Sequence, residues 1–393
     1  MPAAMKMIFW VFLGLTFYTY AGYPVLLWLF SFILQKKVHK KDFLPRVSVI
    51  LSAFNEEKYI ERKIQNLLQL DYPEELLEII IGSDGGSDTT DQIISKFKEH
   101  QIRFFRFVAN QGKPQVINSL VREARGEILL FTDARQDFDP KAVKALVKNF
   151  SDPKVGCVSG ELLFKDIRSG NIGKGMDAYW RYEKFLRKLE SKIDSMLGAT
   201  GAIYAIRKHL YTALPPQILA DDMYLPLSII AKGFRAVFEG DSIAYDHTSG
   251  KGKEEFKRKV RTLAGNYQIF QLLPSLMIPF KSPISVQLFS HKFLRLLIPF
   301  FQMLIFISSF LLIRETPYQI IFWMQVLFYA LAYWESSRET LRVHSADRTH
   351  QSPRKKGLGY IPYTFCLLNY AAMIALFQFL SKKTKSNWEK AYG

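Results

Sequence analysis

Polar side chains follow four of the apolar runs in the first third of the chain. In such places, carboxylates and amides can bind a divalent cation or a ribose, and a lysine that opens a helix favours an anion such as a diphosphate. One such residue alone would be an ordinary turn residue, because Asp and Asn are common in turns. Together they predict a site for a phosphorylated ligand, whose members are Asn55, Glu56, Asp84, Lys113 and Asp133.

Asp84 lies in the segment GSDGGSDTTD, residues 82–91. Its two glycines let the backbone approach a ligand closely. The segment contains neither GxxxxGK[ST] nor GxGxxG, so a P-loop and a dinucleotide-binding fingerprint are both excluded. A carboxylate at this point can instead accept hydrogen bonds from a ribose or a base edge.

A second acidic segment, ILADDMYLPLSIIAKGF, opens an amphipathic helix with Asp221 and Asp222. Acidic residues in a first turn complement the helix dipole, which is a purely structural role. The alternative is catalytic, because a carboxylate can take a proton from a hydroxyl nucleophile. The residues themselves leave both interpretations open.

The basic segment FKRKVRTLAGNYQ, residues 256–268, predicts a helix with Arg258 and Arg261 on one face, since they are three positions apart. These arginines could pair with a departing diphosphate. The run could equally meet anionic lipid headgroups, because it lies close to long apolar segments.

Short β-rich runs alternate with helical patterns from Arg46 to about Tyr267. The predicted strands are RVSVILSAF, LEIIIGSD, RFFRFVAN and GEILLFTDA, and the predicted helices between them are EEKYIERKIQNLLQL, TTDQIISKFKEH and KPQVINSLVREA. This alternation predicts an α/β fold with a mostly parallel sheet covered by helices on both faces. Right-handed crossovers would bring the polar strand ends to one edge, where open α/β folds bind ligands.

The composition points to a membrane. The chain has 393 residues, is 49% hydrophobic and 15% aromatic, and carries a formal net charge of +17. Residues 7–34 contain no charged side chain and exceed the roughly 20 residues that cross a bilayer. Further candidate spans are 293–313, 318–334 and 360–380. A nucleic-acid partner would explain the charge but neither the spans nor the aspartates, so we expect none.

Basic residues beside the spans predict the orientation. QKKVHKKDFLPR follows the first span and SSRETLRVHSADRTHQSPRKK follows the third, which places the intervening domain in the cytosol. The tail SKKTKSNWEK is also basic, although a complete fourth span would put it outside. Either the last segment does not cross fully, or the short tail breaks the rule.

The predicted organisation has four parts. Residues 1–45 form a transmembrane helix and a basic linker, and 46–267 form the cytosolic domain. Residues 268–291 are apolar but contain Pro274, Pro279 and Pro283, so they cannot form one straight helix and are expected to lie along the membrane surface. Residues 292–393 hold the remaining spans and the basic tail. Two cysteines so far apart in the chain indicate no disulfide framework, as expected in a reducing compartment.

From about Val47 to Gln268, the order of these motifs resembles the membrane-embedded inverting family 2 glycosyltransferases, polysaccharide-synthase-like proteins with the GT-A nucleotide-sugar-binding fold. The resemblance implies a GT-A domain inserted between transmembrane helices, in a multi-pass protein of a bacterial inner or plasma membrane. IGSDGGSD matches the nucleoside-contacting motif at Asp84, and FTDAR matches the D-x-D motif at Asp133.

The resemblance also implies roles for the later motifs. Ala220–Asp222 looks like the third acidic motif, which would make Asp222 the base that activates the acceptor hydroxyl. GATGAIYAIRK, with Gly201, is similar to the stretch that lines the acceptor side, together with Asp221. The closing Q/R-x-x-R-W motif aligns at residues 258–262, so Arg258 and Arg261 would face the diphosphate. Thr262 stands where processive synthases have tryptophan, which argues against long polymers.

The D-x-D motif departs from the family at Arg135, which replaces the second aspartate. Mg²⁺ or Mn²⁺ could still be held weakly, because Mg²⁺ often needs only one or two carboxylates plus substrate phosphate oxygens. Alternatively, Arg135 faces the diphosphate as a fixed cation and lessens the need for metal. We expect the metal at Asp133.

The sequence therefore predicts an enzyme that moves a sugar from a nucleoside diphosphate sugar, with UDP expected from the family, to a lipid-linked or saccharide acceptor. One alternative is a processive exopolysaccharide synthase that secretes its polymer through the spans. Another is a transport or scaffold protein whose soluble domain only binds nucleotide. Product length separates the first two, and turnover of a nucleotide sugar would exclude the third.

Overall fold

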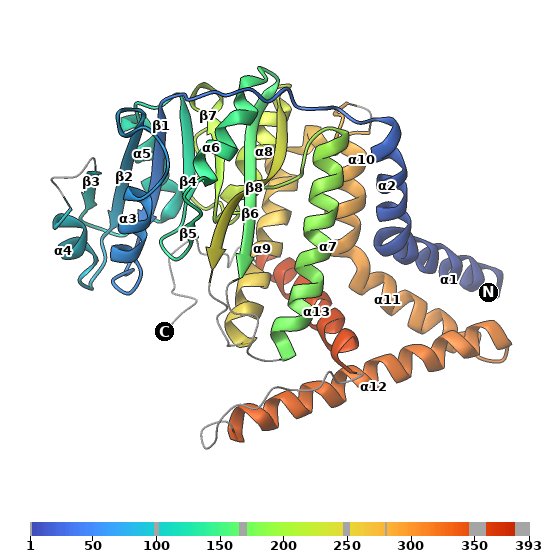
Figure 1. The fold of residues 1–393 in the computed structure, drawn as a ribbon. Coiled ribbons are helices and arrows are strands. Elements are labelled where there is room, and N and C mark those ends of the chain that lie inside the picture. The colour runs from blue at the N-terminus through green and yellow to red at the C-terminus, as the bar shows by residue number, and fades with distance from the viewer. Residues whose placement is uncertain are drawn as a thin grey trace.

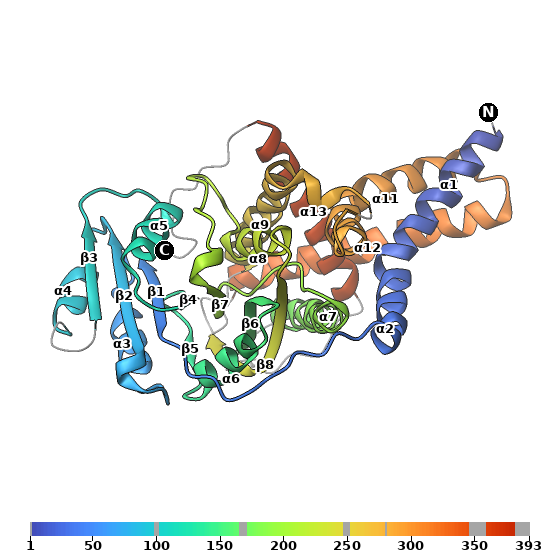
Figure 2. The ribbon, with the colours of Figure 1, turned by 90° about the horizontal axis from the view of Figure 1, so that it is seen from above.

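The computed structural model describes residues 2–97, 102–164, 171–246, 252–279, 281–345 and 359–381. The side chains of 171–178, 252–255 and 339–345 are not described. Two views show a β-sheet at one end of the molecule and a group of long helices at the other (Figures 1 and 2).

The sheet has eight strands among the described residues, in the order β3-β2-β1-β4-β7-β6-β8-β5. The first four strands pair in parallel, as the sequence predicts, and β6 is parallel to β8, whereas β7 and β5 pair only antiparallel. The sheet is therefore mixed in its second half. The strands are β1 (Val47–Ala53), β2 (Leu77–Asp84), β3 (Ile102–Phe107), β4 (Ile128–Thr132), β5 (Asp137–Phe138), β6 (Val155–Phe164), β7 (Tyr204–Arg207) and β8 (Arg235–Asp246).

Helices cover both faces of the sheet, as expected. Within β1, Val49 and Leu51 pack into a core that includes α3, α4 and α6, whereas Ile50 packs into a core that includes α5 and α8. Successive strand residues point to opposite faces, so a strand buried on both sides is apolar throughout. These helices are α3 (Ile60–Leu68), α4 (Thr90–Ser95), α5 (Lys113–Glu123), α6 (Ala142–Val147) and α8 (Asp221–Ala231).

Three helical stretches are long and apolar enough to cross a membrane: Ala3–Ile33, Ser285–Leu311 and Tyr360–Leu380. The first contains α1 (Pro2–Phe17) and α2 (Tyr23–Ile33), joined by a π-helical turn, the second contains α10 (Ser285–Gln287) and α11 (Leu294–Leu311), and the third is α13 (Tyr360–Leu380). The predicted span 318–334 lies inside α12 (Thr316–Ser345). This helix is less apolar, with glutamine at positions 319 and 325, and is not among the three.

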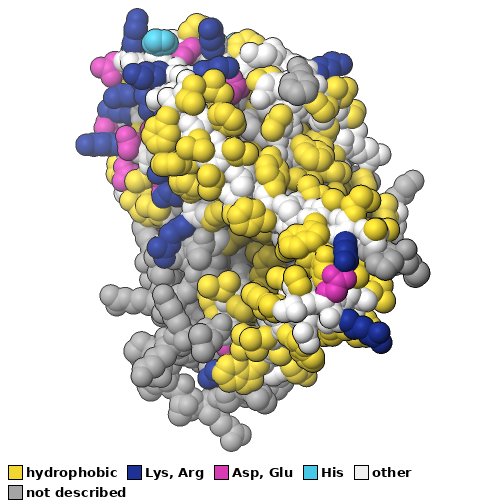
Figure 3. Space-filling view, turned by 90° about the vertical axis from the view of Figure 1, so that its right-hand side faces the viewer, with side chains coloured by type: hydrophobic (Ala, Val, Ile, Leu, Met, Phe, Trp, Pro, Cys, Tyr) yellow, Lys and Arg dark blue, Asp and Glu magenta, His cyan; other side chains and the backbone are white. Residues whose placement is uncertain are grey.

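The helical end of the molecule exposes many hydrophobic side chains, and Lys and Arg gather mainly along one edge of that face (Figure 3). Exposed apolar residues of α1, α2 and α11 include Trp10, Phe17, Trp28, Phe32 and Phe310. Exposed apolar area of this extent marks a surface that meets lipid or a partner. The predicted orientation also depends on the basic segments 336–356 and 381–390. Residues 346–356 of the first segment and 382–390 of the second lie outside the described residues.

The proline-rich segment does break the helical path. Helix α9 (Gly252–Leu272) ends before a single turn at Pro274–Met277, and the next helix begins at Ser285. Residues 285–291, predicted to be interfacial, belong instead to the second candidate span. The four domain boundaries stay predictions.

Two long helices join the sheet to the candidate spans. Helix α7 (Asn171–Ile193) contacts α2, β8 and α13, and α9 contacts α8 and α13. In Figure 1, α7 lies between the sheet and α2. Helix α7 was not expected from the sequence.

Candidate active site

Asp84 ends β2 and is fully buried. Its Oδ1 accepts the backbone N–H of Gln111 at 2.7 Å and its Oδ2 accepts that of Gly112 at 2.9 Å. Burial raises the pKa of Asp84, and these two bonds partly oppose that rise. Asp84 thus holds the loop that precedes α5, and in this structure it does not face an open space where a nucleoside could bind.

The glycines of these loops bring the chain segments together. Gly85 has φ +67°, and a Cβ there would lie 2.8 Å from the carbonyl carbon of Ala109. Only glycine fits such a position without strain.

Asn55 and Glu56 connect β1 to the loop after β2. Asn55 has φ +55°, and its Oδ1 accepts the backbone N–H of Ser87 at 2.7 Å. The backbone N–H of Glu56 donates to Thr90 Oγ1 at 2.8 Å. Both residues therefore shape the edge of the sheet.

Lys113 opens α5 and forms ion pairs with two carboxylates. Its Nζ lies 3.0 Å from Asp133 Oδ1 and 3.4 Å from Asp221 Oδ2. Burial alone would lower its pKa, but the charges of Asp133 and Asp221 outweigh burial and raise the pKa. Lys113 is therefore a fixed cation at the start of a helix.

Asp222 lies close to these charged groups. Its Oδ2 accepts the backbone N–H of Gly201 at 3.2 Å. A Cβ on Gly201 would lie 3.4 Å from Asp222 Oδ2 and 3.8 Å from Asp133 Oδ2, so the two carboxylates face one small space across this glycine. Burial, followed by the charge of Asp221, raises the pKa of Asp222 to about 6, although Lys113 opposes the rise.

Arg135 does not point into this space. It forms an ion pair with Asp246, with 3.4 Å between Nη2 and Oδ1, and its guanidinium lies over the ring of Tyr59. Gln136 donates to the other oxygen of Asp246 at 2.9 Å. The charge of Arg135 is thus already compensated by a carboxylate that is 111 positions away in the sequence.

The structure does not bring the α9 residues into the same cluster. Arg258 is half-buried, Arg261 and Thr262 are exposed, and Thr262 donates to the carbonyl of Arg258 at 3.0 Å. Within the described part of the chain, neither arginine is hydrogen-bonded or ion-paired with Asp133, Asp222 or Lys113. Their expected contact with a diphosphate stays a prediction.

Lys63, which the sequence analysis missed, lies fully buried beneath the Asp133 loop. Its Nζ donates to Thr132 Oγ1 at 2.9 Å and to the carbonyl of Gln136 at 2.7 Å. Thr132 in turn donates to the carbonyl of Ala202 at 2.9 Å, next to Gly201. Burial lowers the pKa of Lys63 to about 7. The only signal in the sequence was a lysine in an otherwise apolar stripe of a helix.

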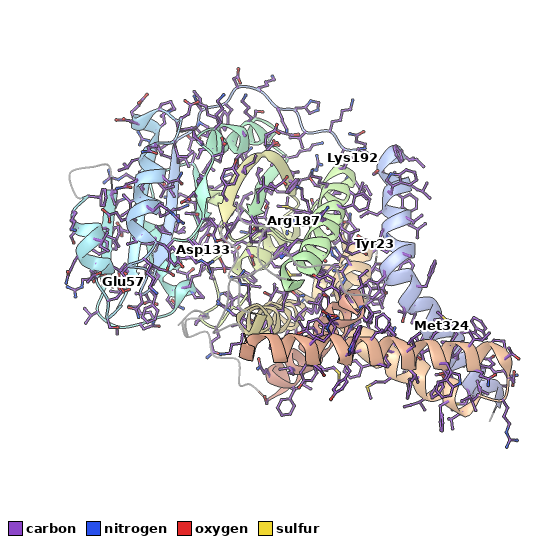
Figure 4. All side chains as sticks on the ribbon, turned by 60° about the horizontal axis from the view of Figure 1, so that its bottom comes forward. Tyr23, Glu57, Asp133, Arg187, Lys192 and Met324 are labelled. Carbon is purple, nitrogen blue, oxygen red and sulfur yellow. The ribbon has the colours of Figure 1, made fainter. Side chains whose placement is uncertain are left out.

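Arg187 on α7 is a second residue that the sequence analysis missed. Figure 4 shows it between Asp133 and Tyr23. Burial lowers its pKa, and the charges of Glu183 and Asp222 oppose that shift. No motif marked this arginine, because its place depends on how α7 packs against the rest of the molecule.

Asp133 is the residue best placed to hold a metal ion. No group of three or more His, Cys, Asp or Glu side chains forms a metal site in the described ranges. The Asp133 side chain is 39% exposed, so it is open to a ligand. One carboxylate with substrate phosphate oxygens and water fits a weakly held Mg²⁺ or Mn²⁺ and does not fit a tight all-protein site.

Comparison with known proteins shows a similarity to glycosyltransferases. Residues 48–213 match the family model described as glycosyl transferase family 2. Poly-beta-1,6-N-acetyl-D-glucosamine synthase of Staphylococcus epidermidis is 32% identical over 144 residues, which are 36% of this chain and 34% of that protein. The probable glycosyltransferase YdaM of Bacillus subtilis is 27% identical over 248 residues, 58% of this chain and 56% of that protein. The matched regions thus span between a third and just over half of these relatives.

A solved structure resembles nearly the whole chain. The mannosyltransferase PcManGT from Pyrobaculum calidifontis, in complex with GDP-Man and Mn²⁺, superposes with a TM-score of 0.71 at 21% identity and covers 96% of this chain and 99% of that one. This likeness shows that the chain has the GT-A-like fold that the sequence predicts.

Proposed function

We propose that the chain, whose residues 48–213 match the glycosyl transferase family 2 model, is an inverting enzyme that moves a sugar from a nucleoside diphosphate sugar to a lipid-linked or saccharide acceptor. The observation that carries this proposal is the placement of Asp222 and Asp133 around Gly201. One carboxylate can serve the acceptor while the other serves the donor phosphates.

In the proposed reaction, Asp222 takes the proton from the acceptor hydroxyl as that oxygen attacks the anomeric carbon. Its pKa of about 6 leaves it ionised at neutral pH yet basic enough to accept a proton. The hydrogen bond from the Gly201 backbone N–H orients Oδ2 of Asp222, whereas Oδ1 of Asp222 accepts no hydrogen bond from the described residues. A single displacement of this kind inverts the anomeric configuration.

The nucleoside diphosphate leaves from the opposite face of the sugar, where Lys113 offers a fixed positive charge near Asp133. When bound, Mg²⁺ or Mn²⁺ would add charge stabilisation for the phosphates, and Asp133 would be its protein ligand. Arg258 and Arg261 are the further cations that we assign to the diphosphate. The loops at the edge of the proposed donor site are held in place by Asn55, Glu56 and Asp84.

We place this domain at the cytosolic face of a membrane, in a multi-pass protein. The three apolar helical stretches support the spans. The basic residues that follow the first stretch, at positions 36, 37, 40 and 41, support the cytosolic side.

The proposal is tested by incubating the purified protein with radiolabelled UDP- and GDP-sugars and a membrane lipid extract, with and without chelator. We expect label from one donor in a short, lipid-soluble product, and a lower rate with chelator. If no donor is turned over with extracts that contain lipid and saccharide acceptors, the chain is not the transferase proposed here.

A processive synthase is the second candidate, because relatives named poly-beta-1,6-N-acetyl-D-glucosamine synthases match this chain. Thr262, at the position of the tryptophan expected in processive synthases, argues against it. The same assay decides, since a processive enzyme would put the label into a long water-soluble polymer.

A further inference from the structure

A cavity of about 350 Å³ opens between α11, α12 and α13. Two of these helices belong to the candidate membrane spans. Its wall is almost entirely apolar and aromatic, with Pro299, Met303, Phe306, Tyr329, Phe365 and Met373 among the lining residues.

The few polar groups of this wall are occupied within the protein. Gln325 Nε2 donates to Gln302 Oε1 at 3.0 Å, and Asn369 donates to the carbonyl of Phe365 at 2.8 Å. A hydrocarbon chain therefore meets little unsatisfied polarity there. Such a cavity suits an apolar chain better than a saccharide, which would need hydrogen-bonding partners.

A buried charged cluster lies next to this cavity, between α7 and the start of α11. His291 Nδ1 lies 2.6 Å from Glu190 Oε1, and Lys292 Nζ lies 3.3 Å from Glu183 Oε2. Arg295 is also ion-paired with Glu183. Charges are rarely buried without partners, so this cluster is a built feature of the fold.

The cluster and the cavity are contiguous. Arg295 and Pro299 are four positions apart on α11 and share one face of that helix. The ring of Tyr20 lies under the Arg295 guanidinium, with 5.9 Å to its centroid, and packs against the ring of Phe365 at 5.5 Å. Phe365 lines the cavity. A cationic group thus stands at one end of an apolar space.

The cations of this region have donor capacity to spare. Arg295 Nε and Nη2 are buried without an acceptor among the described residues. Arg187, four positions beyond Glu183 on α7, makes no hydrogen bond or ion pair in the described part of the chain, and it is close enough to Asp222 and Glu183 to interact electrostatically with both. Asp222 is a third carboxylate near these cations, beside the two glutamates of the cluster. The unused hydrogen-bond donors of Arg295 and Arg187, and not an excess of positive charge, are therefore what offers a site to an anion.

We propose that the acceptor is a saccharide linked to a lipid through phosphate: its hydrocarbon chain occupies the cavity between α11, α12 and α13, its phosphate binds Arg295 and Arg187, and its saccharide reaches Asp222. This assignment rests on the proposed glycosyl transfer and names the acceptor class. Arg187 joins the two parts of the site, because it lies between the charged cluster and the catalytic carboxylate. A guanidinium is well suited to phosphate oxygens because its donors form a planar fork.

Cys366 makes the cavity accessible to measurement. It lines the cavity and is partly exposed, whereas the other cysteine, Cys157, is fully buried. The alkylation rate of Cys366 by N-ethylmaleimide, read by mass spectrometry of the full chain in phosphatidylcholine nanodiscs, therefore reports on occupancy. The probes are hexadecyl phosphate, hexadecanol, inorganic phosphate and phosphatidylglycerol.

Hexadecyl phosphate should slow the alkylation of Cys366 about tenfold more than hexadecanol does, because only the former engages the arginines. Inorganic phosphate should give no protection, because it lacks the chain. Equal protection by hexadecanol would overturn the phosphate site. Equal protection by phosphatidylglycerol would show a site for bulk anionic lipid and would overturn the acceptor assignment.

Variants separate the two halves of the site. Arg187→Gln and Arg295→Gln should each remove the preference for hexadecyl phosphate over hexadecanol. Should the Arg295→Gln variant fail to fold, the Arg187→Gln variant alone provides the test. Met373→Trp should fill the cavity and abolish retention of hexadecyl phosphate in native mass spectrometry, a readout that does not need Cys366. Phe377→Trp, on the same helix but outside the cavity and 66% exposed, is the matched control and should bind normally. Retention by Met373→Trp at the control level would refute the chain site.

The outcome also distinguishes this inference from the proposed function. Asp222→Asn should bind hexadecyl phosphate as the unmodified protein does while losing transfer. Transfer to a water-soluble saccharide without any protection of Cys366 would refute the lipid site and keep the transferase. Protection of Cys366 by hexadecyl phosphate without turnover of any nucleotide sugar would support the lipid site and refute the transferase.

Discussion

Asp222 Oδ2 accepts a hydrogen bond from the backbone N–H of Gly201 at 3.2 Å, and Asp133 Oδ2 lies 3.8 Å from the position that a Cβ on the same glycine would take. The two carboxylates come from the start of α8 and the end of β4, 89 positions apart in the chain. In the proposed reaction, Asp222 serves the acceptor and Asp133 serves the donor.

The rate of transfer should fall in acid as Asp222 takes up its proton. A general base works only when ionised, and burial with the charge of Asp221 raises the pKa of this carboxyl to about 6. Below this pH the turnover number should drop about tenfold per pH unit, and above it the rate should level off. Steady-state assays across this range check the prediction, and a rate that stays constant well below pH 6 would contradict it.

Gly201→Ala should cost activity without unfolding the domain. The new methyl group would lie 3.4 Å from Asp222 Oδ2, which the fold tolerates, but it would stand between the two carboxylates. We expect a loss of about a hundredfold in transfer, because small displacements of reacting groups have such effects. Gly198→Ala is the control, since its methyl would make only ordinary contacts, with the Met223 side chain at 3.6 Å and the Asp222 backbone carbonyl at 3.8 Å, and the activity should stay close to normal. Similar losses in both variants would argue against the crowding explanation.

Lys113→Met should weaken donor binding and shift the pH profile. The variant lacks the cation 3.0 Å from Asp133, so the Michaelis constant for the donor should rise about tenfold. Lys113 also lowers the pKa of Asp222, so its removal should move the acid limb to higher pH. Lys144→Met removes a half-buried lysine paired with Asp71 at 2.5 Å, away from Asp133 and Asp222, and should change neither quantity. If the acid limb of the Lys113→Met variant does not shift, Lys113 does not influence the pKa of Asp222.

Lys63 should make the folded domain more stable as the pH rises. Its pKa is about 7 in the folded protein, below its ordinary value, so the unfolded chain binds the proton more readily between these two values. Protonation of Lys63 in the unfolded chain therefore favours unfolding at the lower end of this pH window. Above about pH 7, the contribution of Lys63 to the free energy of unfolding should rise by on the order of 1 kcal/mol per pH unit. Thermal unfolding of the unmodified protein and Lys63→Met at two pH values measures it. A difference between the two proteins that does not change with pH would show that Lys63 does not titrate in this way.

Much of the first half of the domain could be predicted from the sequence. Strands β1 to β4 and helices α3 to α5 were visible because apolar runs alternate with helical periodicity, and parallel pairing then gathered the strand ends at one edge. Asp133 and Lys113 could be found in this way, whereas Asp222 was found as an acidic helix start that resembles a family motif. The antiparallel pairing of β7 could not, because it depends on contacts between distant segments.

The residues that the sequence analysis missed or misplaced share one property. Arg135 pairs with Asp246, Lys63 donates to the loop around Thr132, and Arg187 depends on the packing of α7. In each case the function of a charged side chain is set by a partner that lies far away in sequence. No local pattern carries that information, whereas a strand end or a helix start does.

Asp222→Asn provides the most direct test of the account. The variant keeps the shape of the side chain but cannot accept the proton, so donor binding, measured by calorimetry with the nucleotide sugar that the unmodified protein turns over, should change by less than about twofold. Transfer of labelled sugar should fall by about a thousandfold or more. If the variant binds the donor normally and keeps a tenth of the transfer rate, Asp222 is not the base and the central claim is wrong.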